Sequence, residues 1–115
     1  MRYSLTRILA RAGYEVLPVG EAGAALEILG NSLPVDVLVS DIGLPDMRGT
    51  QLVRQALTLS PLTVSVLITG DPFDPADIPD RVPVLRKPFP SQDLIAAVRD
   101  ALARSKQLPR KLDRQ

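Results

Sequence analysis

The sequence predicts an α/β domain in which a doubly wound parallel sheet is covered by helices. Three short valine-rich runs, at 35–40, 64–68 and 82–85, have the composition of strands buried on both faces. Segments with apolar residues at helical spacing stand between and around these runs. Strands that alternate with helices form a parallel sheet with right-handed crossovers. A chain of 115 residues has room for one such domain.

The expected elements are bounded by residues that end helices or strands. Gly13 ends the first helix as a C′ glycine does, and Pro61 marks the end of the third. Pro18 and Pro83 cannot donate a ladder hydrogen bond, so the strands that contain them are expected at the two edges of the sheet. In order, we expect a helix at 4–12, a strand at 14–19, a helix at 21–29, a strand at 35–40, a helix at 50–59, strands at 64–68 and 82–85, and a helix at 92–103 capped by Ser91.

The segment 70–80 differs from the rest because it is rich in proline. Pro72, Pro75 and Pro79 lack the backbone N–H, so no helix longer than about one turn is expected here. If a turn forms, Asp74 is placed to cap it and Pro75 to occupy its first position. We expect this segment to be mainly a loop.

The composition excludes several kinds of site. Without cysteine the chain has no disulfide and no thiolate zinc site, and without histidine it has no imidazole base or ligand. A metal would therefore be a hard cation held by oxygen atoms, of the Mg²⁺ kind. No apolar run approaches the ~20 residues of a membrane span, and the first residues lack the apolar segment of a secretory signal. We expect a cytoplasmic protein that does not engage a membrane.

The net charge of +1 is unevenly distributed. Residues 104–115 contain five basic residues and one acidic residue, whereas residues 1–103 contain nine basic and twelve acidic residues. We expect a domain at 1–103 followed by a basic C-terminal tail at 104–115. No aromatic side chain is interleaved with the basic ones of the tail, so direct nucleic-acid contact is not expected.

Three polar side chains of different chemistry each follow a valine-rich run. They are the carboxylate of Asp41, the hydroxyl of Thr69 and the ammonium of Lys87. Ligands of open α/β sheets bind outside the carboxyl ends of the strands. Taken singly, Asp41 is equally compatible with capping a turn, Thr69 with bonding its own backbone and Lys87 with a solvated surface charge. Together they predict one site at this edge of the sheet.

Motifs around these residues resemble those of a known family. The segment 41–49, with Gly43, Pro45 and Gly49, resembles a phosphoacceptor strand end and the loop after it. Thr69-Gly70 resembles the pair of a hydroxyl residue and a small residue that ends the fourth strand of that family, and Lys87-Pro88-Phe89 resembles the end of its fifth strand. Residues 13–16 resemble the start of its second strand, and residues 24–26 resemble part of its second helix. From residue 1 to about 103, the chain is similar to the receiver domains of two-component response regulators, which have a flavodoxin-like fold and include the chemotaxis regulators.

The resemblance implies a signalling domain, not an enzyme, that is phosphorylated by a sensor histidine kinase or a phosphotransfer protein. Asp41 would be the phosphoacceptor, Thr69 the switch hydroxyl and Lys87 the phosphate contact. Mg²⁺ would be held by Asp41 and the backbone carbonyl of Gly43. The family's lysine–proline bond is commonly cis, so a cis bond is expected before Pro88.

The chain departs from the family because it lacks the first strand and the acidic pair that ends it. In the order 2-1-3-4-5 this strand is central, between the segments at 14–19 and 35–40. Each unpaired buried backbone group costs ~1–3 kcal/mol. We therefore expect a fragment whose true start lies upstream, direct pairing of the flanking strands, or a gap filled by another chain, as in a homodimer. Mg²⁺ binding is expected to be weak or absent, and phosphorylation slow or absent.

A second departure is the 70–80 segment, where the family's fourth helix is shortened or absent, and Val84 stands where a switch aromatic is often found. These departures favour an alternative, a degenerate receiver that acts as a phosphorylation-independent protein-interaction module. A phosphatase with an aspartyl nucleophile is a third possibility. It would need a second aspartate two residues after Asp41, where this chain has Gly43.

Overall fold

The structure, a computed structural model, describes residues 2–31 and 34–107. Its sheet is parallel, and the order of the strands in space follows their order in the chain. The strands are β1 (Val37–Asp41), β2 (Val64–Thr69) and β3 (Val84–Arg86). In the described part of the chain, no helix is both long enough and apolar enough to cross a membrane.

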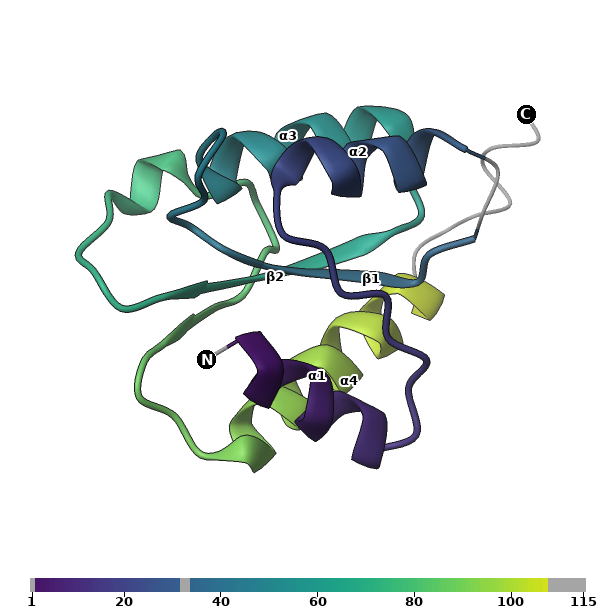
Figure 1. The fold of residues 1–115 in the computed structure, drawn as a ribbon, viewed down its shortest axis with the longest axis vertical. Helices are drawn as coiled ribbons and strands as arrows, with labels where there is room; N and C mark the ends of the chain where they lie inside the picture. The colour runs from purple at the N-terminus through teal and green to yellow at the C-terminus, as the bar shows by residue number, and fades with distance from the viewer. Residues whose placement is uncertain (1, 32–33, 108–115) are drawn as a thin grey trace.

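Helices cover both faces of this sheet, as Figure 1 shows. One layer contains α1 and α4, and the other contains α2 and α3. The helices are α1 (Arg2–Arg11), α2 (Ala22–Gly30), α3 (Gly49–Leu59) and α4 (Ser91–Gln107). The predicted doubly wound α/β architecture is therefore confirmed. The last helix begins at Ser91 itself and continues past its expected end at Ala103, and residues 108–115 of the predicted basic tail lie outside the described residues.

The core forms on both faces of the central strand β2, because a helix layer covers each face of the sheet (Figure 1). Val66 and Ile68 face the α1–α4 layer, while Leu67, between them in sequence, faces α3. This alternation follows from the two-residue period of a strand. The cluster on the α1–α4 side consists of Leu9, Val66, Ile68, Leu94, Val98 and Ala101. On the other side lie Ile42, Val53 and Leu67, with Ala22, Ala25 and Leu52 beside them.

The prediction of a strand at 14–19 is wrong. The segment between α1 and α2 has no strand hydrogen bonds, and the direct pairing with β1 that the sequence left open is not formed in the described residues. Tyr14 and Val16 pack against the α1–α4 core, whereas Leu17 is 59% exposed. The residues have strand propensity, but a strand also needs a neighbour for its backbone groups, and none lies alongside.

The proline-rich segment forms the single turn that the sequence allows. The 3₁₀ turn η1 (Pro75–Asp77) follows Asp74, whose side chain accepts a hydrogen bond from the Ala76 N–H at 2.9 Å. The Arg54 side chain on α3 donates to the Asp77 carbonyl at 2.8 Å and ties this turn to the helix. The expectation of a shortened fourth helix therefore agrees with the structure of residues 70–83. The predicted strand at 82–85 forms only from Val84.

A carboxylate from the loop after β1 caps α2. Asp46 Oδ1 accepts the Ala22 N–H at 3.0 Å, and Oδ2 accepts the Gly23 N–H at 2.9 Å. Glu21, the residue before the helix, makes no side-chain cap bond, so Asp46 takes this role from a distant part of the chain. The bonds from Gly23 and then Ala22 lower the pKa of Asp46 below its ordinary value of 3.8.

Replacement of Asp46 by asparagine is expected to remove a pH-dependent part of the stability. Because the carboxyl pKa is lower in the folded state, its contribution is present at neutral pH and is lost as the pH falls below 3.8 through the folded value. Urea unfolding should therefore show a stability difference between wild type and Asp46→Asn that shrinks from pH 7 to pH 3. Asp100→Asn, on the exposed face of α4, controls for the loss of one carboxylate. A difference that stays constant with pH would contradict the capping role.

Candidate functional site

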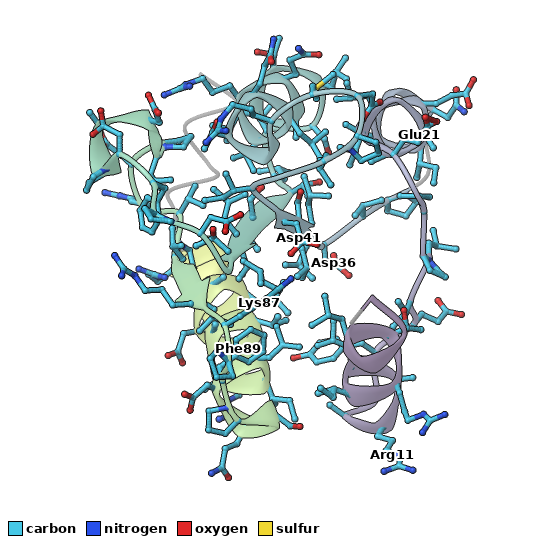
Figure 2. All side chains as sticks on the ribbon, turned by 60° about the vertical axis from the view of Figure 1, so that its left-hand side comes forward. Arg11, Glu21, Asp36, Asp41, Lys87 and Phe89 are labelled. Carbon is cyan, nitrogen blue, oxygen red and sulfur yellow. The ribbon has the colours of Figure 1, made fainter. Side chains whose placement is uncertain are left out.

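The side chains of Asp41 and Lys87 meet at the carboxyl edge of the sheet. Asp41 is the last residue of β1, and Lys87 directly follows β3. The Lys87 Nζ lies 3.1 Å from the Asp41 Oδ1, and about a third of each side chain is exposed. Figure 2 shows both residues between the helix layers. Two strands that are separated by β2 thus place a carboxylate and a cation in contact, as the topology predicts.

The Asp41 Oδ1 atom is buried and accepts no hydrogen bond from the described residues. The ammonium of Lys87 is the polar group that the structure places against it. A buried carboxylate oxygen without a donor is costly unless a positive charge compensates it. The pair therefore places a buried carboxylate oxygen beside a cation.

Thr69 lies at the same edge, but its hydroxyl is bonded elsewhere. Its Oγ1 donates to the Asp71 carbonyl at 2.8 Å and accepts the Asp71 N–H at 3.0 Å. The backbone of Thr69 is joined to the site, since the Lys87 N–H donates to the Thr69 carbonyl at 2.8 Å. The structure thus brings Asp41 and Lys87 into contact and places Thr69 beside Lys87, with its hydroxyl turned to the loop after β2.

The loop after Asp41 is held by short backbone hydrogen bonds. The Ile42 N–H donates to the Ile68 carbonyl at 2.8 Å, and the Gly49 N–H donates to the Ile42 carbonyl at 2.6 Å. An antiparallel bridge joins Gly43 and Arg48 inside the loop. These bonds fix the backbone on the carboxyl side of Asp41, including Gly43, which was predicted to offer its carbonyl to a metal.

The residues present do not fit a resident magnesium ion. Among residues 2–31 and 34–107, no three acidic side chains gather into a group that could hold a metal. Asp41 and the Gly43 carbonyl supply oxygen atoms from two residues, while Mg²⁺ demands near-octahedral coordination by oxygen. One of the Asp41 oxygens is also held by the Lys87 cation.

Sequence reasoning missed two residues beside the site. A cavity of about 270 Å³ opens next to Lys87, between the turn after Thr69 and the end of β3. The Arg86 guanidinium lies over the Phe73 ring, 5.2 Å from its centroid, at the wall of this cavity. The signal in the sequence was an arginine directly before the strand-end lysine. Its aromatic partner lies on a loop whose path the sequence does not specify.

Comparisons with known proteins identify the family. Residues 1–99 match the family described as response regulator receiver domain. The response regulator receiver protein CpdR of Brucella abortus is 34% identical over 106 residues, which are 89% of this chain and 88% of that protein. The transcriptional regulatory protein CreB of Escherichia coli is 32% identical over 103 residues. The match covers 75% of this chain but only 43% of CreB.

Solved structures show the same fold. A response regulator receiver protein from Sinorhizobium medicae superposes with a TM-score of 0.84 at 28% identity, over 90% of this chain and 86% of that one. A receiver domain protein described as CheY-like, from Methanospirillum hungatei, gives a TM-score of 0.80 at 28% identity, over 92% and 87% of the two chains. The fold is thus the flavodoxin-like receiver fold, and the chain belongs to the family of response regulator receiver domains of two-component signal transduction.

Proposed function

We propose that this chain receives a phosphoryl group on Asp41 from a sensor histidine kinase or a phosphotransfer protein. Receiver domains are signalling modules that interact with such partners, and the chain belongs to this family. The observation that supports the proposal is the contact of 3.1 Å between the Asp41 carboxylate and the Lys87 ammonium. In this proposal, residues 1–103 form the receiver unit and 104–115 a basic tail.

In the transfer, an Asp41 carboxylate oxygen attacks the phosphorus of a phosphohistidine. The new O–P bond forms as the N–P bond breaks, and the imidazole nitrogen that leaves takes up a proton. Charge develops on the phosphoryl oxygens, where the Lys87 ammonium lies close enough to stabilise it. Before the transfer, the Lys87 ammonium is paired with the Asp41 carboxylate. After it, the ammonium lies beside the phosphoryl group, whose negative charge takes the place of the carboxylate's.

Thr69 takes the part of a switch in this proposal. Its hydroxyl can bond a phosphoryl oxygen only after it leaves the N–H and the carbonyl of Asp71. That exchange would free the turn that carries Phe73, and with it the contact of Phe73 with Arg86. The 70–80 loop would then report the phosphorylation of Asp41 to the surface, without an aromatic residue at Val84.

Incubation with a small acyl phosphate and Mg²⁺ tests the proposal. We expect slow, incomplete addition of one phosphoryl group, because no group of acidic side chains among the described residues could hold the metal. Intact-mass measurement should detect it in the wild type and not in Asp41→Asn. Asp36→Asn, which removes an exposed carboxylate at the other end of β1, is the matched control.

Modification that persists in Asp41→Asn would contradict the assignment of Asp41. Rapid, stoichiometric modification of the wild type would contradict only the expected impairment. The intact mass gives the extent of modification, and sequencing of the modified peptide gives its position.

A second candidate is a receiver that binds its partners without being phosphorylated. It is favoured by the lack of an acidic cluster in the described residues and by the hydroxyl of Thr69, which is already satisfied. A metal that binds only the folded state raises the melting temperature. For this candidate, Mg²⁺ should leave the melting temperature unchanged, and no phosphoryl donor should modify Asp41. A magnesium-dependent rise with complete modification would exclude it.

A further inference from the structure

The guanidinium of Arg86 is fixed against an aromatic ring but has no anionic partner. It lies over the Phe73 ring, 5.2 Å from the centroid. Within residues 2–31 and 34–107, no carboxylate is close enough to Arg86 for an ion pair, and no acceptor bonds its side-chain N–H groups. These donors all lie in the plane of the guanidinium, and the ring covers a face of that plane. The donors at its edge are therefore available to a ligand.

The charges around Arg86 leave this cation unmatched. Arg86, Lys87 and Asp71 all line the cavity between the loop after β2 and the end of β3. The Lys87 ammonium is already paired with Asp41, at 3.1 Å. Asp71 makes no ion pair with either cation in the described part of the chain. Arg86 thus offers the cavity a positive charge that no contact neutralises.

The cavity has the size and the walls for a small organic molecule. Its volume is about 270 Å³, just below the roughly 300–1,000 Å³ of pockets that hold drug-sized ligands. Pro72 and Phe73 contribute apolar surface to its wall. The stem of Lys87 contributes as well, since its Cδ would lie 3.7 Å from a Cβ atom placed on Gly70, which also lines the cavity.

The remaining polar groups at the cavity wall are largely occupied. The Thr69 hydroxyl donates to the Asp71 carbonyl at 2.8 Å and accepts the Asp71 N–H at 3.0 Å. These groups satisfy one another within the turn. A ligand in the cavity would therefore be oriented by Arg86, through donors that the protein leaves unused.

We propose that this cavity binds a small organic monocarboxylate, whose carboxylate pairs with the Arg86 guanidinium and whose carbon skeleton lies against Pro72 and Phe73. The planar fork of a guanidinium matches a carboxylate with two parallel hydrogen bonds. Because the ring already fixes the plane of Arg86, binding costs less side-chain freedom than at a mobile arginine. One unpaired cation matches a monoanion, whereas a phosphate dianion would bring a second negative charge close to Asp71. The site does not depend on phosphorylation of Asp41.

Titration of the whole, unphosphorylated chain with benzoate tests this proposal, with amide chemical shifts as the measurement. The shifts of Asp71, Phe73 and Arg86, which line the cavity, should change and saturate. Benzamide has the same shape without the charge. It should bind at least about tenfold more weakly, because hydrogen bonds between charged groups are stronger than neutral ones.

Three variants test the part that each charge plays. Arg86→Gln should weaken benzoate binding about tenfold or more, since it removes the charged fork. Arg99→Gln removes an exposed arginine of α4 and should leave binding unchanged. Asp71→Asn should strengthen binding, because it removes a negative charge from the cavity wall. The bonds of Thr69 to residue 71 use backbone atoms and remain in this variant.

The absence of saturable shifts with benzoate would overturn the proposal, as would equal affinities of the wild type and Arg86→Gln. Tighter binding of inorganic phosphate than of benzoate would overturn the assignment to a monocarboxylate. Tighter binding of a glutamate-containing peptide would assign the site to a side chain of a partner and overturn the assignment to a free acid. Arg86 is exposed, so its variant should keep the fold, and Asp71→Asn provides a second measure that does not alter the arginine.

Discussion

Gly49→Ala is expected to destabilise the protein by about 1–3 kcal/mol or more, since it forces extra volume into a packed site. Gly49 is the first residue of α3 and lies against the end of β1. A Cβ atom there would collide with the carbonyl oxygen of Asp41 and lie 2.9 Å from the Ile42 Cα. Both are backbone atoms, so no change of rotamer relieves the contact. The end of β1 or the start of α3 must move.

Gly20→Ala is the matched control for this prediction. A Cβ on Gly20 would meet no atom within 4 Å, so its stability should equal or exceed that of the wild type. Urea unfolding of the two variants measures the difference directly. If Gly49→Ala unfolds at the same urea concentration as Gly20→Ala, the close approach of α3 to Asp41 is not a constraint on the fold. A displaced Asp41 should also slow the phosphorylation proposed above.

Local signals in the sequence were sufficient for β1 and β2. Each is a valine-rich run, and both formed close to the predicted positions. The turn in the proline-rich segment was equally local, because Asp74 and Pro75 together specify where one turn can begin. Such elements depend on residues within a few positions of one another.

The segment at 14–19 failed for the opposite reason. Its alternation and its valines are those of a strand, yet pairing depends on a neighbour that the sequence cannot place. The capping of α2 by Asp46 also escaped prediction, because the two are joined across 23 and 24 residues of chain. Contacts between distant segments are settled by the fold as a whole.

At the site, topology predicted more than side-chain chemistry did. The rule that parallel strands end at one edge was enough to bring Asp41 and Lys87 together. It could not show that the hydroxyl of Thr69 is held by Asp71, or that Arg86 lies over Phe73. Both depend on the path of the loop after β2, which is also held by the distant bond from Arg54 to Asp77 and which local signals do not specify.

Leu67→Ala is expected to cost about 2–5 kcal/mol, because the deletion leaves a cavity in a close-packed core. Leu67 is fully buried in the centre of β2, against Val53 of α3 and Ile42 of the loop after Asp41. Phe73 from the loop after Thr69 packs against the same cluster. The cavity would thus lie beneath both loops that frame the site. In a domain whose total stability is about 5–15 kcal/mol, this loss is a large fraction.

Leu57→Ala removes the same atoms from a side chain that is 43% exposed on α3, and serves as the matched control. It should cost well under half as much, since little apolar surface returns to water and no cavity forms. Urea unfolding of both variants gives the two costs, and equal costs would show that Leu67 is not the packed centre of the sheet. The contact of Phe73 with Arg86 depends on the same cluster. Leu67→Ala should therefore also loosen the loop after Thr69, seen as faster amide exchange in residues 70–74, while Leu57→Ala should not.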